Sequence, residues 1–220
     1  MSNFKPTFFY PEFLKSSAFL MSLMIIIFIN PFLDDSLIGR LVSSLLVILT
    51  TVGALMVMFS HRELIWFVLL MVILSITVEL LSLTFNNAFF LGIKYLCYST
   101  INTTFAVILF YYLMKVQPLS LSEIGNAISI YLLVGLSFGY FYCFWAQHHP
   151  MAFSNLAKET KTDQFGLIYY SFITLTTTGY GDIQPLTKVP RILAIFETVF
   201  GTFYIAIIIG RLVGLGNKKS

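Results

Sequence analysis

The amino-acid sequence predicts an all-α membrane protein, and two observations support that prediction. The chain has 220 residues, of which 58% are hydrophobic and only 10% are charged, and its mean hydropathy is +0.87. A soluble domain has about 25% charged residues, and a single core could not bury this much apolar surface. The apolar residues also fall into long runs, so we expect lipid to surround most of the chain.

Six apolar runs are separated by short polar segments. A helix rises about 1.5 Å per residue, so about 20 residues cross a bilayer core of about 30 Å. Most runs reach that length and the first is the shortest, and we expect six transmembrane helices. The runs cover residues 16–33, 37–59, 63–85, 89–114, 120–147 and 189–214.

A seventh segment, residues 164–176, lies between the last two runs and is too short to cross the bilayer. Its roughly 13 residues would reach only about 20 Å as a helix. We therefore expect a re-entrant helix, which enters the membrane and returns to the side from which it came.

The positions of lysine and arginine predict how the helices are oriented. Lys5 and Lys15 precede the first run, Lys115 follows the fourth, and Lys218 and Lys219 end the chain. Basic residues are enriched in cytoplasmic loops, so we expect both termini in the cytoplasm. The short length of the chain favours a prokaryotic inner membrane.

The segment most informative about function is residues 169–185, with the sequence YYSFITLTTTGYGDIQP. A cation that sheds its water in a membrane needs replacement oxygens, and consecutive backbone carbonyls supply them if all point at one axis. An ordinary helix or strand cannot aim its carbonyls this way. Alternating left-handed conformations can, and glycine adopts them without steric cost. This requirement explains Gly179 and Gly181.

This motif resembles the selectivity filter of the potassium channel family, whose pattern Thr-x-Gly-Tyr-Gly falls on residues 177–181. The resemblance covers about residues 120–216. It implies that four backbone carbonyls coordinate K⁺ and that the first threonine hydroxyl adds the innermost site. The coordinating residues are then Thr177, Thr178, Gly179 and Tyr180, and Gly181 completes the filter.

The resemblance also implies which residues support the filter. Tyr180 would point away from the ion and brace the loop against Tyr169 and Tyr170 of the half-length helix. Asp182 would form a hydrogen bond behind the filter to the same aromatic residues.

Two positions depart from the family pattern. The second filter residue is commonly valine and is Thr178 here. Threonine is nearly isosteric with valine, so we expect potassium preference to persist. Many members also have a glutamate four residues before the filter threonine, where this chain has Ile173. That change removes one partner for Asp182.

One chain supplies one filter segment, whereas a ring of carbonyls around an ion needs four. We therefore expect a homotetramer with closed symmetry around a central pore. The expected function is passive potassium conduction with no cofactor and no catalysis. A net charge of +3 gives no indication of nucleic-acid binding. The alternatives are a weakly selective monovalent cation channel and a non-conducting regulatory or sensor subunit. No gating ligand or partner is identified.

The sequence divides into three parts: a four-helix transmembrane domain at residues 1–118, a pore domain at 119–216 and a cytoplasmic tail at 217–220. Voltage sensors carry repeated arginines in their fourth helix. The fourth run here holds only Lys94, with Lys115 at its inner end. We therefore expect weak or no voltage dependence.

Three features inside the apolar runs have competing interpretations. Glu79 and Lys94 should lie at similar depth, and we interpret them as an ion pair, with a sensing role as the alternative. Glu197 either faces the pore or, as we favour, faces the half-length helix and ties down the filter. Gly201 is either a gating hinge or a close-packing residue.

Overall fold

The computed structural model describes residues 10–33, 37–58, 65–84, 88–115, 121–156 and 164–216. Within these residues the chain is all-helical, as predicted, and has no β-strand. The elements are α1 (Tyr10–Ile29), η1 (Asn30–Phe32), α2 (Leu37–Met58), α3 (Ile65–Thr84), α4 (Ala88–Lys115), α5 (Leu121–His148), α6 (Gln164–Leu175) and α7 (Lys188–Gly216).

Four of the described helical segments are long and apolar enough to cross a membrane. They are Glu12–Phe32, Ala88–Lys115, Leu121–His148 and Lys188–Arg211. The helices α2 and α3 contain shorter apolar stretches, Leu41–Val57 and Leu69–Ser82. The prediction of spanning helices is thus supported for α1, α4, α5 and α7, while α2 and α3 stay predicted spans.

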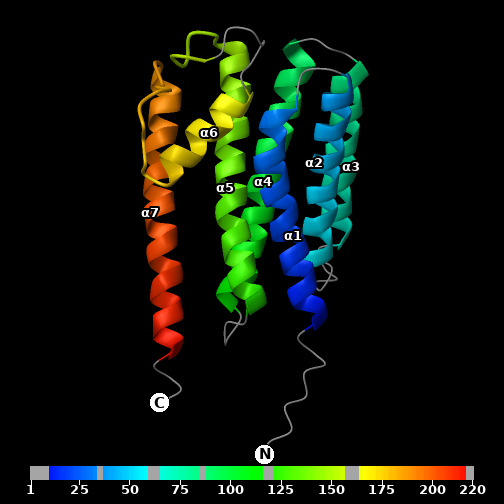
Figure 1. The fold of residues 1–220 in the computed structure, drawn as a ribbon, viewed down its shortest axis with the longest axis vertical. Coiled ribbons are helices and arrows are strands. Elements are labelled where there is room, and N and C mark those ends of the chain that lie inside the picture. Colours follow the sequence, from blue (N-terminus) through cyan, green and yellow to red (C-terminus); the bar gives the residue numbers. More distant parts are fainter. Residues whose placement is uncertain are drawn as a thin grey trace, which may run out of the picture.

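The long helices run side by side along one direction (Figure 1). The central element is α5, which packs along α4 and also contacts α1, α6 and α7. The short helix α6 lies obliquely between α5 and α7, and the chain after it returns to the end of the bundle where α7 begins (Figure 1). The start of α1 and the end of α7 lie at the same end of the bundle.

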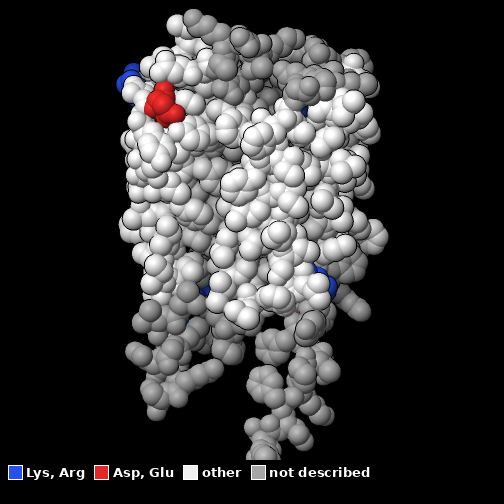
Figure 2. Space-filling model, viewed as in Figure 1, with Lys and Arg blue, Asp and Glu red and all other residues white. Residues whose placement is uncertain are grey.

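The surface of the bundle has the charge pattern expected of a membrane protein. On the face in Figure 2, the described charged side chains gather near the two ends and leave a broad uncharged band between them. Large apolar side chains are exposed along the helices, among them Leu45, Ile73 and Ile195. Exposed apolar surface on this scale would be unfavourable in water but suits lipid.

Two glycines of α5 allow α6 to pack closely. A Cβ atom built on Gly135 would lie 2.5 Å from Cε1 of Phe172, and one on Gly139 would lie 3.0 Å from Cα of Ile168. The hydroxyl of Ser171 also donates a hydrogen bond of 2.7 Å to the carbonyl of Gly135. The small residues therefore let α6 approach α5 closely enough for a side chain of α6 to reach the backbone of α5.

The contact between α6 and α7 depends on Gly201. A Cβ atom on this residue would lie 2.1 Å from the carbonyl oxygen of Leu175, the last residue of α6. No side chain fits at that distance, and the obstacle is backbone rather than a flexible side chain. The geometry supports the close-packing interpretation of Gly201.

Replacing Gly201 with alanine should therefore destabilise the protein, because the new methyl group would push α7 away from the end of α6. Overpacking of this kind costs about 1–3 kcal/mol. Gly210 is the matched control, since a Cβ atom there would meet nothing within 4 Å. The measurement is the thermal midpoint of the purified protein in detergent. Equal midpoints for G201A and G210A would contradict the packing interpretation.

Candidate ion-conduction site

The segment that follows α6 folds back over the end of that helix. The amide of Thr177 donates to the carbonyl of Thr174, and the amide of Gly179 donates to the carbonyl of Ile173, both at 3.0 Å. These bonds satisfy carbonyls at the last turn of α6, which have no partner within the helix. They also fix the point from which residues 176–182 extend.

The backbone of this segment alternates in handedness. Thr177 has a φ of 60°, Gly179 a φ of 51° and Gly181 a φ of 79°, so every second residue lies in the left-handed region. A Cβ atom on Gly179 would meet nothing within 4 Å, so its φ rather than a lack of space requires glycine. The sequence pattern predicts this conformation at the two glycines. It does not predict it at Thr177, where a β-branched residue adopts it at a cost of about 1–2 kcal/mol.

The same segment is exposed in the single chain. Residues 176–182 are all exposed, and the Tyr180 side chain is 73% exposed. Ile183 directly after them is buried. The bracing of Tyr180 against Tyr169 and Tyr170, which the resemblance implies, stays a prediction.

Two polar side chains hold the end of this segment, and a third holds the chain just beyond it. The side-chain amide of Asn155 donates to the carbonyl of Asp182 at 2.8 Å, and that of Gln184 donates to the carbonyl of Gly181 at 3.0 Å. Nε of Arg191 donates to a third carbonyl, that of Pro185, at 2.8 Å. Asn155 was not identified from the sequence, because a single asparagine in a loop has no distinguishing pattern.

The two tyrosines of α6 point in different directions. Tyr169 is half-buried, and its side chain interacts with that of Asp182. Tyr170 is buried, and its ring meets those of Tyr142 and Phe153 edge-on at 5.2 and 5.4 Å. Successive residues of a helix lie about 100° apart, so the pair cannot share one face. Only Tyr169 reaches Asp182.

Glu197 lies at the junction of α5, α6 and α7. Its side chain is completely buried, and its carboxyl group accepts a hydrogen bond of 2.8 Å from the Tyr142 hydroxyl. It also lies within hydrogen-bonding distance of the Ser171 hydroxyl, whose single proton is shared with the carbonyl of Gly135. Tyr142 belongs to α5 and Ser171 to α6. Glu197 therefore faces the half-length helix, in the direction favoured from the sequence, and it connects all three helices.

Glu79 and Lys94 face each other between α3 and α4. Nζ of Lys94 lies 3.1 Å from Oε1 of Glu79, whose side chain is almost fully buried. The carboxylate also accepts hydrogen bonds from the hydroxyls of Ser44 on α2 and Tyr98 on α4. This ion pair lies more than 80 residues before the filter segment in sequence and belongs to the peripheral helices.

Residues 127–216 match a family model described as an ion channel. This region of the chain is similar to the ion channel family. The matched region contains α6, the segment of alternating handedness and α7, together with most of α5. Since these helices are apolar and long, the chain is an integral membrane protein.

A curated relative agrees with the family match. The chain is 32% identical over 102 residues to two-pore potassium channel 5 of Arabidopsis thaliana. The match covers 45% of this chain and 22% of the relative, so the chain spans about a fifth of that protein's length. No solved structure matches the chain. Both matches are to channels and neither is to an enzyme.

Reversing the charge of either side chain, with E79K or K94E, should lower the yield of folded protein. Breaking a buried ion pair costs about 3–5 kcal/mol, since it leaves a charge without a partner in a low-dielectric environment. The double variant E79K/K94E restores opposite charges, so its yield should recover. Size-exclusion chromatography of the detergent-solubilised protein measures this. A K115E variant at the exposed end of α4 is the control for the charge change alone. A double variant no better than the single ones would end the ion-pair interpretation.

Proposed function

We propose that this chain is one subunit of a homotetrameric potassium channel whose four filter segments surround a common axis. The carbonyls of Thr177, Thr178, Gly179 and Tyr180 would replace the water around K⁺, with Gly181 completing the filter. The observation that supports this most strongly is the left-handed backbone at every second residue from 177 to 181. It occurs at the end of a half-length helix, within the region that matches the ion channel family model.

The exposure of the filter segment in one chain supports assembly. Residues 176–182 are exposed and irregular, and backbone of this kind inside a membrane must be buried in protein or line a water-filled path. Four copies around an axis satisfy both conditions at once. The exposed apolar residues of α7, which include Phe196 and Phe203 at 64% and 63%, would then line subunit contacts and the inner pore.

The proposed topology follows from the same assembly. The six long helices would cross the membrane, and α6 with the filter segment would form a re-entrant loop on the outer side. Both termini would lie in the cytoplasm, in a prokaryotic inner membrane. The start of α1 and the end of α7 lie at one end of the bundle, which supports a common side for the termini (Figure 1). Residues 1–118 would form a peripheral domain and residues 119–216 the pore domain.

Potassium flux through purified protein in liposomes tests the proposal. Wild-type protein should release K⁺ from loaded liposomes, and Ba²⁺ should block the release. G179A should abolish the flux, because alanine is strained at a φ of 51°. Chemical cross-linking should still give tetramers of G179A, which separates loss of the filter from loss of assembly. A tetrameric wild-type protein without flux would favour the non-conducting sensor alternative.

Selectivity is tested by the reversal potential in mixed K⁺ and Na⁺. The Thr178 hydroxyl lies 3.0 Å from that of Thr176, so it has a partner that is not the ion. We therefore expect clear K⁺ preference in the wild type and little change in T178V, since the coordinating carbonyl is unaltered. A reversal potential that does not change with the ratio of K⁺ to Na⁺ would favour the weakly selective alternative.

A further inference from the structure

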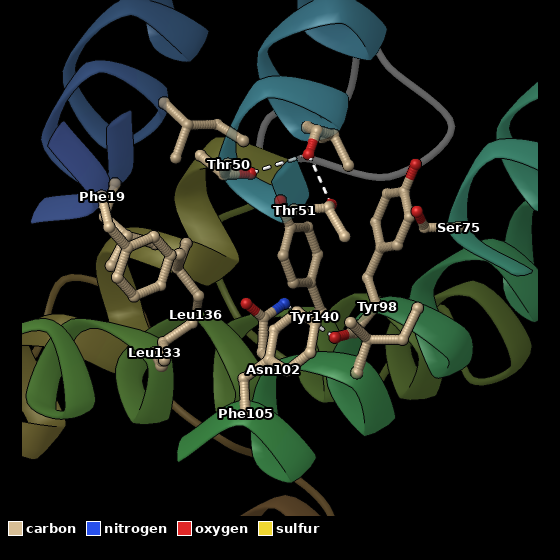
Figure 3. Close-up of a pocket in the computed structure, with 14 residues that line it drawn as sticks. Phe19, Thr50, Thr51, Ser75, Tyr98, Asn102, Phe105, Leu133, Leu136 and Tyr140 are labelled. Carbon is tan, nitrogen blue, oxygen red and sulfur yellow. Dashed lines mark hydrogen bonds between the residues drawn. The ribbon is translucent and has the colours of Figure 1, made fainter. Parts of the chain in front are cut away.

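A small cavity lies where five helices meet, away from the filter segment. Its volume is about 30 Å³, and α1, α2, α3, α4 and α5 all contribute to its walls, whereas α6 and α7 do not (Figure 3). Most of the wall is apolar, including Phe19, Leu23 and Leu133. The polar side chains in the wall are Thr50, Thr51, Ser75, Tyr98, Asn102 and Tyr140.

Four of these polar side chains donate a hydrogen bond to a backbone carbonyl of their own helix. Such local bonds leave the side-chain oxygens free to accept further hydrogen bonds. The bonds are Thr50 to Val47 (2.8 Å), Thr51 to Val47 (2.7 Å), Ser75 to Val72 (2.8 Å) and Asn102 to Tyr98 (2.7 Å). The cavity wall therefore offers several acceptors, contributed by α2, α3 and α4.

Tyr140 of α5 presents the complementary group. Its side chain is 2% exposed, and among the described residues its hydroxyl has no hydrogen-bond partner. The hydroxyl of a buried tyrosine usually has one. Its ring is held against Tyr95 and Tyr98, at centroid distances of 6.5 and 5.4 Å. In Figure 3 the Tyr140 side chain lies among Thr51, Tyr98 and Asn102. The Tyr98 hydroxyl donates its own hydrogen bond to Glu79.

We propose that this cavity is a binding site for one or two water molecules. One water needs about 10–15 Å³ of such space and two to four polar partners, and the cavity provides both. Its lining has no Lys, Arg, Asp or Glu, which favours a neutral ligand, and its volume excludes anything much larger than water. A bound water accepts a hydrogen bond from the Tyr140 hydroxyl and donates its two hydrogen bonds to oxygens of α2, α3 or α4. It thereby links the peripheral helices to α5, the helix that supports α6.

Removing the Tyr140 hydroxyl gives opposite results for a hydrated and a dry cavity. If the cavity is dry, Y140F removes an unpaired buried polar group and raises the thermal midpoint of the purified protein. If water is bound, the same change removes a hydrogen bond to that water and lowers the midpoint. We expect a lower midpoint. A raised or unchanged midpoint would overturn the proposal.

Threonine-to-valine changes provide a matched comparison within the chain. The hydroxyls of Thr51 and Thr104 both donate to the carbonyl four residues earlier, at 2.7 and 2.8 Å. Only Thr51 lines the cavity, whereas Thr104 is half-buried on α4 outside it. T51V should lower the midpoint more than T104V. Equal effects would mean that Thr51 contributes only its bond to its own helix.

The bound water can also be detected directly. In solid-state NMR of the full chain in lipid bilayers, magnetisation transferred from water should reach the side chains of Thr51 and Asn102. It should not reach the methyl groups of Leu167, which is fully buried in α6 outside the cavity. The transfer should weaken in Y140F. Absence of transfer to both side chains in the wild type would overturn the proposal even if Y140F were destabilising.

Discussion

The conformation of residues 176–182 has to be imposed by the rest of the structure. The segment belongs to no helix or strand, and three of its seven residues have a left-handed backbone. At Thr177 this conformation costs about 1–2 kcal/mol relative to an ordinary one. Without contacts to the rest of the protein, this segment would therefore leave the left-handed conformation for a more favourable one. Hydrogen bonds to the last turn of α6 fix one end of the segment, and those from Asn155 and Gln184 fix the other.

The position of α6 itself depends on polar groups that are buried between helices. The Glu197 carboxyl group, which is fully buried, accepts a hydrogen bond from Tyr142 of α5 and lies within hydrogen-bonding distance of Ser171 of α6. An unpaired polar group of this kind would be strongly unfavourable in a low-dielectric interior, so these partners are needed to hold it. At the C-terminal end of α6, the Tyr131 hydroxyl donates to the carbonyl of Leu175 at 3.1 Å. Together with the close approach at Gly201, these contacts leave α6 little freedom to tilt.

The sequence predicted features that depend on local composition and on the chemistry of single residues. Long apolar runs predicted the helices, and a half-length segment at 164–176 predicted α6 to within one residue. The need for left-handed backbone predicted the conformation of both filter glycines. Hydropathy was less informative at α1, which begins at Tyr10 rather than at residue 16. The polar Glu12 and Lys15 interrupt the apolar pattern there without interrupting the helix.

Features that depend on tertiary contacts could not be obtained in this way. Asn155 reaches Asp182 only because the loop after α5 folds over the end of the filter segment. The separation of Tyr169 and Tyr170 onto different faces follows from helix geometry, but which of them meets Asp182 is decided by how α6 packs on α5. The cavity at Tyr140 gathers residues from five helices, and no pattern within one helix indicates it.

The ion pair between Glu79 and Lys94 restrains the only lysine within the fourth apolar run, which argues against a voltage-sensing role. Lys94 lies 3.1 Å from a buried carboxylate that also accepts hydrogen bonds from Ser44 and Tyr98. Moving one charge fully across the membrane gains about 2.3 kcal/mol per 100 mV, whereas breaking a buried ion pair costs about 3–5 kcal/mol. The cost of separation therefore exceeds the gain at ordinary membrane potentials. Because α4 also packs along most of α5, the ion pair fixes α3 to a helix that is itself fixed to the region that matches the ion channel family. This packing agrees with the expectation of weak or no voltage dependence, which stays a prediction.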